Sequence, residues 1–258
     1  AIQELLKYCK FTPALLEASA PTRVPEKVRQ RWSTLPEMLL PTLLPLLNSR
    51  YVVQQTEPRP REMPLYAHST SYRDWVQAWT LWLIRSSRPG DAASLFHIFT
   101  SVVRDHDVGI AQYLLPHLVL HILISGSSQQ RRTVLGESLA VLADQAHPAL
   151  GYEPERRRLT AQTLFHVLDH VGHWMRRMRL VPLRMARRSR WRDALIDVQA
   201  IMDELSPDLL AQASLQCDAY ARALLHFEYR IRAMRPQPSE TLQPYYETMH
   251  EILSLIHI

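Results

Sequence analysis

Apolar residues recurring at the spacing of an α-helix are the feature that most constrains the fold of this chain. Trp75, Ala78, Trp79 and Trp82 follow the i, i+3, i+4, i+7 pattern that places side chains on one helix face. The same spacing returns in three later sets: Leu95, Ile98, Phe99 and Val102; Leu164, Val167, Leu168, Val171 and Met175; and Trp191, Ala194, Leu195, Val198 and Met202. Only residues 51–53 look locally strand-like, so the sequence predicts an all-α fold.

Helix-breaking residues divide the chain into segments of about 12 to 20 residues. Pro89-Gly90 ends the helix of the tryptophans, Asp91 is the predicted N-cap of the next, and Gly109 marks a further boundary. Other predicted loops or caps lie at residues 58–64, 125–128, 148–154, 206–207 and 236–238. A helix with one apolar stripe cannot bury that stripe alone. Stacked antiparallel helix pairs, an α-solenoid, are therefore expected.

One helix pair is predicted in more detail, within residues 209–232. Ala211 and Ala223 are small residues at the positions where two helices of a tetratricopeptide-like pair cross, with Leu210 beside them. Phe227 supplies the aromatic side chain that fills the space between those helices. The Trp expected near the start of such a unit is absent, because Pro207 stands there.

Composition excludes several classes of protein. The 258 residues are 47% hydrophobic and 21% charged, which is typical of globular domains, and they include only 6 Gly, too few to favour a Rossmann or P-loop nucleotide site. Cys9 and Cys217 are the only cysteines, so a disulfide framework is not expected and a reducing compartment fits. Apolar runs at residues 35–47 and 113–124 fall short of a membrane span, and no signal peptide is visible.

Two histidine motifs raise the question of metal binding. His166, Asp169, His170 and His173 share one helix face, opposite the predicted apolar stripe, and their spacing could hold a zinc ion. A polar outer face is the favoured interpretation, because no second helix carrying ligands is evident. His117 and His121 lie beside Pro116 in an apolar segment, where a packed histidine pair at a helix kink is expected. We therefore predict neither a metal site nor a cofactor site.

The stretch from residue 176 to residue 192 is strongly basic. Eight of its 17 residues are Arg and none is acidic: Arg176, Arg177, Arg179, Arg184, Arg187, Arg188, Arg190 and Arg192. A solvated loop between helices is the favoured interpretation. The alternative is contact with a partner, either nucleic acid or an acidic protein segment, through Arg176, Arg177, Arg184, Arg187 and Arg188. The net charge of +5 is too small to indicate nucleic-acid binding by itself.

No catalytic residue is predicted. Cys217 has no evident activating base, and a G-x-S-x-G motif is absent. The residues 104–107 (Arg-Asp-His-Asp) resemble a kinase catalytic loop but lack the downstream Asn and D-F-G, so they are interpreted as the end of a helix. Trp75, Trp79 and Trp82 could stack on bases, but tryptophans at helical spacing are expected to fill a core.

Residues 209–230 resemble the start of the FAT domain of ATR-type checkpoint kinases, a group of phosphatidylinositol-3-kinase-related protein kinases. The matching positions are Leu210, Ala211, Ala213, Ser214, Ala219, Tyr220, Arg222, Ala223, His226, Phe227 and Glu228. Three further blocks agree in order, at residues 113–123, 163–174 and 245–251. The resemblance therefore covers most of residues 65–251, and general likeness suggests a fungal member.

The resemblance implies a fold, a function and partners. Such kinases carry a HEAT-repeat arm, a FAT domain of tetratricopeptide-like repeats and a C-terminal kinase domain, and they act in the nucleus in DNA-damage and replication-stress signalling. The expected partners are the rest of the kinase chain, an ATR-interacting protein and a second copy of the parent, with only indirect contact to nucleic acid and none to membranes. ATP and a divalent metal belong to the kinase domain, so this chain is expected to be a non-catalytic scaffold. The rival expectation is a free helical adaptor.

The expected organisation has four parts. Residues 1–64 form a helical-repeat segment ending in a Pro-rich loop, and residues 65–205 form a second segment carrying the Arg-rich loop. Residues 206–251 begin the FAT domain. Residues 252–258 depart from the family pattern and are expected to be a non-native tail. The absence of Met at position 1 also suggests a fragment.

Overall fold

The computed structural model describes residues 2–16, 23–48, 62–105, 108–147, 153–180, 188–234 and 239–256. All regular structure in these residues is helical, which confirms the all-α prediction. The chain divides into two compact units. The first comprises residues 1–59 and 89–107, and the second comprises residues 60–88 and 108–258. Residues 89–107 thus group with the N-terminal part of the chain.

The first unit is built from short helices. It contains α1 (Ile2–Tyr8), η1 (Pro13–Leu16), α3 (Glu26–Ser33), η2 (Glu37–Leu39), α4 (Leu40–Asn48), α7 (Asp91–Ile98) and α8 (Thr100–Asp105). Its small core holds Leu6, Phe11, Val24 and Val28. The Trp32 ring packs edge-on against Phe11, with the ring centroids 5.1 Å apart.

Two predictions for the first unit were wrong in detail. The apolar set beginning at Leu95 does not form one buried face, because Ile98 is buried and Leu95 is 38% exposed. The helix also stops at Ile98 and restarts at Thr100. The N-cap of α7 is Gly90 and not Asp91, which is the first helical residue and places its carboxylate at the positive end of the helix dipole. Helix α8 is described as far as Asp105, and residues 106–107 of the predicted helix end lie outside the described residues.

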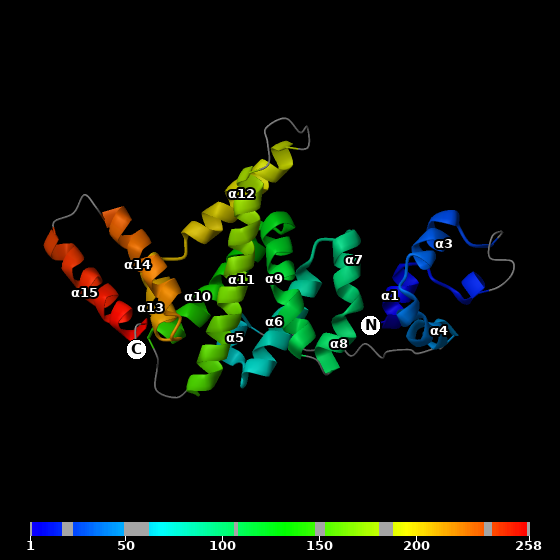
Figure 1. Ribbon diagram of the computed structural model, residues 1–258, viewed down its shortest axis with the longest axis horizontal. Helices are drawn as coiled ribbons and strands as arrows, with labels where there is room; N and C mark the ends of the chain where they lie inside the picture. Colours follow the sequence, from blue (N-terminus) through cyan, green and yellow to red (C-terminus); the bar gives the residue numbers. More distant parts are fainter. Residues whose placement is uncertain are drawn as a thin grey trace. The chain divides into compact units, whose positions relative to one another are not determined.

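The second unit is a sequence of longer helices, each packed against its neighbours (Figure 1). It contains α5 (Leu65–His68), α6 (Tyr72–Ser86), α9 (Val108–Ser125), α10 (Ser128–Ala146), α11 (Pro154–Leu180), α12 (Arg188–Asp203), α13 (Pro207–Leu215), α14 (Tyr220–Met234) and α15 (Ser239–Ile256). Contacts run from α6 to α9, from α9 to α11 and α12, from α10 to α11 and α13, and then from α13 through α14 to α15. Packing between successive neighbours is the arrangement expected of a HEAT-like solenoid.

Helix α9 is the most apolar element of the second unit. It is long and apolar enough to cross a membrane by length and composition alone, and it is longer than the apolar run that the sequence suggested. Leu115, Leu118 and Ile122 are fully buried among neighbouring helices, as expected of the central helix of a folded unit. Gly109 does not separate helices as predicted, because it lies inside the first turn of α9.

The tryptophan prediction is confirmed for two of the three residues. Trp75 and Trp79 have no exposed surface, and their ring centroids lie 5.3 Å apart inside the core. Trp82 is only partly buried. Trp191, which the spacing placed on a buried face of α12, is 48% exposed, whereas Ala194 and Val198 on the same face are buried. The buried set of α11 is confirmed by Leu164, Val167, Val171 and Met175.

The Arg-rich stretch is not a single loop. Helix α11 continues through Arg176, Arg177 and Arg179 to Leu180, and α12 begins at Arg188. Only residues 181–187 lie between these helices, and Arg184 and Arg187 fall outside the described residues. The prediction was wrong because Arg, Met and Leu are good helix formers, and the first proline after residue 154 is Pro182.

Candidate functional site: the junctions between helices

The predicted helix pair is present, formed by α13 and α14. Ala211 and Ala223 have no exposed surface and lie in one cluster with Phe227, which is 6% exposed. The Phe227 ring also meets the ring of Tyr245 on α15, with the centroids 6.2 Å apart. Alanine at a crossing allows two helices to approach closely, because there is little side chain between their backbones. We call Ala211, Ala223 and Phe227 the alanine crossing.

Other residues of the family motif surround this crossing. Leu210 is 8% exposed on α13, and the amide of Ala219 donates a 2.9 Å hydrogen bond to the carbonyl of Ser214 in the turn before α14. The Tyr220 hydroxyl donates to Asp218 at 3.3 Å. Glu228 forms an exposed pair with Arg232 one turn later, which stabilises a helix only slightly. The motif is therefore mostly structural.

Arg222 connects α14 to α11. Its two terminal nitrogens donate to both carboxylate oxygens of Asp169, at 2.8 and 2.5 Å, and its guanidinium lies 4.8 Å from the centre of the Phe165 ring. A bidentate pair over an aromatic face fixes direction as well as distance. Asp169, a candidate metal ligand in the sequence, is thus occupied by an arginine.

The two histidine motifs meet each other. The ring of His117 on α9 packs edge-on against His170 on α11, with the centroids 4.6 Å apart. His121 lies beside the hydroxyl of Ser125, at 3.3 Å, and its predicted packing against His117 stays a prediction. Within the described residues, no group of three or more His, Cys, Asp or Glu side chains is placed to hold a metal ion.

His166 lines an open groove of about 390 Å³ between α6, α9 and α11. Three polar groups of the groove bind one another. The Tyr72 and Thr163 hydroxyls are 2.7 Å apart, and Gln112 donates to the Tyr72 hydroxyl. These contacts join three helices.

Burial lowers the pKa of several histidines. Desolvation is the main cause for His226 on α14, assisted by the nearby positive charge of Arg222, and its pKa falls to about 4. Desolvation also lowers the pKa of His170, with smaller contributions from His117, His166 and His173. These histidines are neutral at pH 7, so they do not extend the basic surface of the Arg-rich stretch.

Glu137 forms a junction that the sequence analysis missed. This residue of α10 has no exposed surface, and its carboxylate accepts hydrogen bonds from the backbone amides of Leu65 and Tyr66, at 2.6 and 2.8 Å, and from the indole of Trp75 at 2.7 Å. The carboxylate therefore caps the N-terminus of α5 from another helix. We call Glu137 and its three donors the carboxylate junction. Burial raises the pKa of Glu137, although these hydrogen bonds oppose the shift.

Two further polar contacts hold the same segment. The guanidinium of Arg156 on α11 donates to the Tyr66 carbonyl at 2.8 Å and lies 4.9 Å from the centre of the Tyr66 ring. The Tyr66 hydroxyl donates to Asp144 on α10 at 2.5 Å. Burial, followed by the hydrogen bond to Asp144, raises the pKa of Tyr66. Helix α5 is thus fixed to α10 and α11 through one tyrosine.

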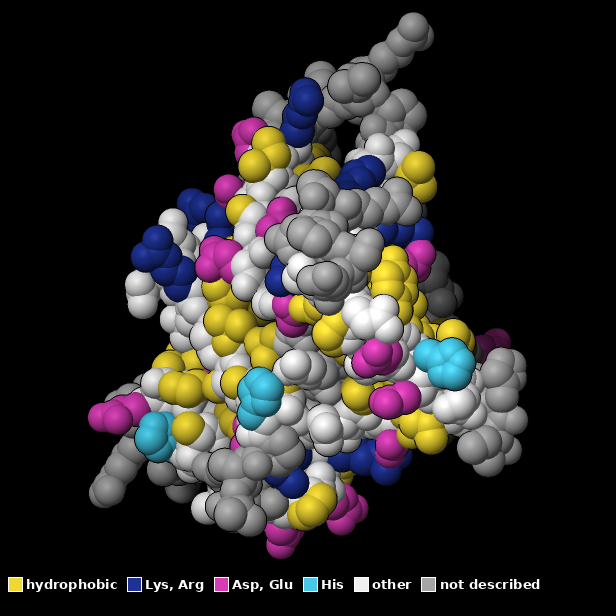
Figure 2. Space-filling view, turned by 90° about the vertical axis from the view of Figure 1, so that its left-hand side faces the viewer, with side chains coloured by type: hydrophobic (Ala, Val, Ile, Leu, Met, Phe, Trp, Pro, Cys, Tyr) yellow, Lys and Arg dark blue, Asp and Glu magenta, His cyan; other side chains and the backbone are white. Residues whose placement is uncertain are grey.

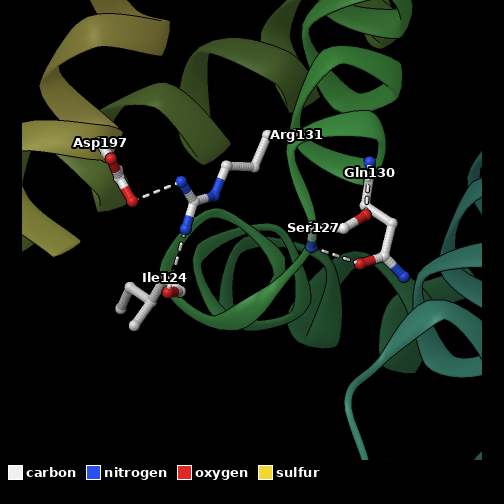
Figure 3. Close-up of polar contacts among 5 residues, drawn as sticks. All are labelled: Ile124, Ser127, Gln130, Arg131 and Asp197. Carbon is white, nitrogen blue, oxygen red and sulfur yellow. Dashed lines mark hydrogen bonds and ion pairs between the residues drawn. The ribbon is translucent and has the colours of Figure 1, made fainter.

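The first turn of α10 is another polar junction (Figure 3). Ser127 and Gln130 form a capping box, which confirms the predicted cap at residues 125–128. Gln130 also donates to the carbonyl of Ser86 at the end of α6, at 2.7 Å. Arg131 pairs with Asp197 on α12 and donates to the carbonyl of Ile124 on α9. Four helices are linked within one turn.

Cys217 lies in the turn between α13 and α14 and is 3% exposed. Burial raises its pKa to about 11. The thiolate that a nucleophile requires is therefore strongly disfavoured at pH 7.

Comparison with known proteins identifies the family. Residues 59–257, well over half of the chain, match the family model described as "Serine/threonine-protein kinase ATR, M-HEAT region". The chain belongs to this family. The match to this family model includes residues 206–251 under the same description. The predicted start of a FAT domain at these residues stays a prediction. The predicted non-native origin of residues 252–258 also stays a prediction.

The chain is similar to three curated kinases, among others. It is 26% identical over 98% of its length to Protein kinase rad3 of Schizosaccharomyces pombe, and 27% identical over 90% to Serine/threonine-protein kinase ATR of Oryza sativa subsp. japonica. It is 23% identical over 96% to Serine/threonine-protein kinase MEC1 of Eremothecium gossypii. The matched region covers 11%, 9% and 11% of these relatives, about a tenth of their length. The relatives include fungi and plants, so the fungal origin stays a prediction.

Proposed function

We propose that this chain is a non-catalytic scaffold segment of an ATR-type serine/threonine protein kinase that acts in DNA-damage and replication-stress checkpoint signalling. The observation that carries the proposal is the match of residues 59–257 to the M-HEAT region of ATR. The chemistry of the second unit is consistent with such a role. Its most elaborate polar groups, at Glu137, Arg131 and Arg222, bind other helices of the same unit.

The physical role we propose is to maintain the geometry of a helical stack. Each junction binds one helix to the next, so a displacement at one end of the stack would be passed on by packed neighbours. The rest of the kinase chain, an ATR-interacting protein and a second copy of the kinase are the proposed partners, and the nucleus is the proposed location. ATP and its divalent metal would bind in the kinase domain of the parent and not in this segment.

The test uses the full-length kinase that contains this segment. Phe227→Ala removes the buried ring of the alanine crossing, and Tyr220→Ala removes its partly buried neighbour. Leu225→Ala is the control, because Leu225 on α14 is 45% exposed. We expect the first two variants to lower thermal stability or to alter stimulation of the kinase, and the control to do neither. Unchanged melting and unchanged kinase regulation in both test variants would contradict a scaffold role.

The alternative, a free helical adaptor, is less well supported. It depended on the Arg-rich stretch alone, whereas the similarity to ATR-type kinases extends over 90% or more of the chain in three relatives. The two interpretations differ in the length of the native protein. An antibody against this segment would detect a very large kinase in the first case and a small protein in the second.

A further inference from the structure

The end of α11 presents arginines and a leucine on one exposed strip. Arg176, Arg177 and Leu180 are exposed and lie within one turn of each other, whereas Met175 and Val171 on the opposite face are buried. Leu180 is 81% exposed. The start of α12 adds Arg192 and the 48% exposed Trp191. We call these five residues the arginine surface.

The two helices that carry this surface are in contact. Arg179 of α11 hydrogen bonds to Gln199 of α12, and the two helices pack against each other within the second unit. The residues on α11 and those on α12 therefore belong to two helices that pack against each other. This placement corrects the expectation that these arginines belong to a loop.

The arginines of the arginine surface form no ion pair within the part of the chain that the structure describes, and the exposed Asp193 follows Arg192 directly. Other arginines of the second unit pair with carboxylates of neighbouring helices, as Arg131 does with Asp197 and Arg222 with Asp169. Arg176, Arg177 and Arg192 form no ion pair with any described residue. No acidic residue occurs in the sequence between positions 170 and 192. A local excess of positive charge thus remains available to a ligand.

This excess is local. On the face of the protein shown in Figure 2, basic, acidic and apolar side chains are interspersed. The net charge of the whole chain is only +5. Attraction of an acidic ligand is therefore expected to depend on the arginine surface and not on the general field of the protein.

We propose that the arginine surface is a docking site for an acidic, amphipathic protein segment. Guanidinium groups bind carboxylates in a bidentate manner, and exposed Leu180 and Trp191 would cover the apolar side of such a segment. The cores of protein–protein interfaces are enriched in Arg and Trp and contain few Lys and acidic residues. Nucleic acid is the less favoured ligand, because a phosphate backbone offers nothing to an exposed leucine. The residues of the arginine surface are given by the structure alone, whereas the test in the full-length kinase rests on the proposed function.

The experiment uses the full-length kinase and a synthetic probe. The probe is a fluorescent helical peptide of about 20 residues, one face Glu and the other Leu, with a Gln-for-Glu version as its charge control. We expect the acidic peptide to bind, and the double variant Arg176→Gln/Arg177→Gln to weaken binding by about tenfold or more. Leu180→Ser should weaken it by about threefold or more at constant salt. Arg132→Gln, an exposed arginine on α10, is the matched control and should leave binding unchanged.

The same measurement with single-stranded oligothymidine separates the two ligand classes. If oligothymidine binds more weakly than the acidic peptide, and if Leu180→Ser leaves oligothymidine binding unchanged, the protein-segment proposal is supported. Tighter oligothymidine binding that is lost in the double arginine variant would overturn it in favour of nucleic acid. Equal peptide binding by the wild-type kinase and the double variant, or equal binding of the Gln peptide, would also overturn it. All substituted residues are exposed, so a melting curve suffices to establish that each variant is folded.

Discussion

The carboxylate junction and the alanine crossing join helices by opposite means. At the carboxylate junction, the buried Glu137 carboxylate on α10 accepts three hydrogen bonds, two from backbone amides at the start of α5 and one from Trp75 on α6. At the second, two alanines without exposed surface allow α13 and α14 to approach, and a phenylalanine fills the remaining space. The polar junction specifies a unique arrangement, but the protein loses much stability if one hydrogen-bonding group is removed. At the apolar crossing, the loss of stability increases gradually with the side-chain volume that is added or removed.

Removing the Glu137 carboxylate should have the largest effect. Glu137→Ala leaves three buried donors without an acceptor, and we expect a loss of about 3–5 kcal/mol in the free energy of unfolding. Glu155→Ala, at an exposed position in the first turn of α11, is the control and should cost less than about 0.5 kcal/mol. Urea denaturation followed by circular dichroism measures both. A Glu137→Ala midpoint equal to that of the control would show that the junction contributes nothing.

Enlarging the alanine crossing should have a smaller effect. Ala223→Leu places extra atoms where α13 and α14 meet, and we expect it to cost about 1–3 kcal/mol, because neighbouring side chains can adjust in part. Ala233→Leu, on the exposed side of α14, is the matched control and should be close to neutral. If both substitutions melt at the same temperature, the helices do not cross as closely at Ala223 as the structure indicates.

Two titratable groups, His226 on α14 and Glu137 on α10, should respond oppositely to pH, with the smallest effect of the three. The pKa of His226 is about 4 in the folded chain and 6.5 without the fold, so its contribution to stability is complete above pH 6.5 and is lost as the pH falls toward 4. We expect a loss of about 1–2 kcal/mol from this group, allowing for its partial exposure. His226→Asn should flatten the dependence of the unfolding midpoint on pH between 6.5 and 4. An unaltered slope would contradict the assignment.

Glu137 gives the opposite sign. Its pKa is raised in the folded chain, so its contribution is complete below the unfolded value of 4.5 and declines as the pH rises through the folded value. The difference in unfolding midpoint between the His226→Asn protein and the wild type, measured across pH, therefore isolates the stability that is lost at acid pH.

The alanine crossing could be predicted from sequence, but the carboxylate junction could not. Ala211, Ala223 and Phe227 belong to two successive helices, so helical spacing and one short turn suffice to bring them together. Glu137 meets Leu65 across 72 residues of sequence, a pairing that only the tertiary fold decides. One signal was available, since Glu137 lies three residues after Val134 and four before Val141, on the apolar stripe of α10. A carboxylate on a buried stripe indicates a hidden set of donors.

The remaining errors have a common physical origin. Spacing predicts which side of a helix is apolar, but not how far the neighbouring helices extend along it. Trp191 is on the expected side of α12 and is nevertheless half exposed, while Ala194 one turn later is buried. The family motif indicated the right family, whose M-HEAT region matches residues 59–257, and the start of a FAT domain within that range stays a prediction.

The turn after α13 supplies a natural reporter of local motion. Asp218 adopts a left-handed backbone conformation, with φ of 59°, immediately after the buried Cys217. A thiol in that position reacts with a maleimide only when α13 and α14 separate, while the partly exposed Cys9 reacts without such an opening. The ratio of the two labelling rates would therefore measure how often this helix pair opens locally, without an introduced dye site or a mutation.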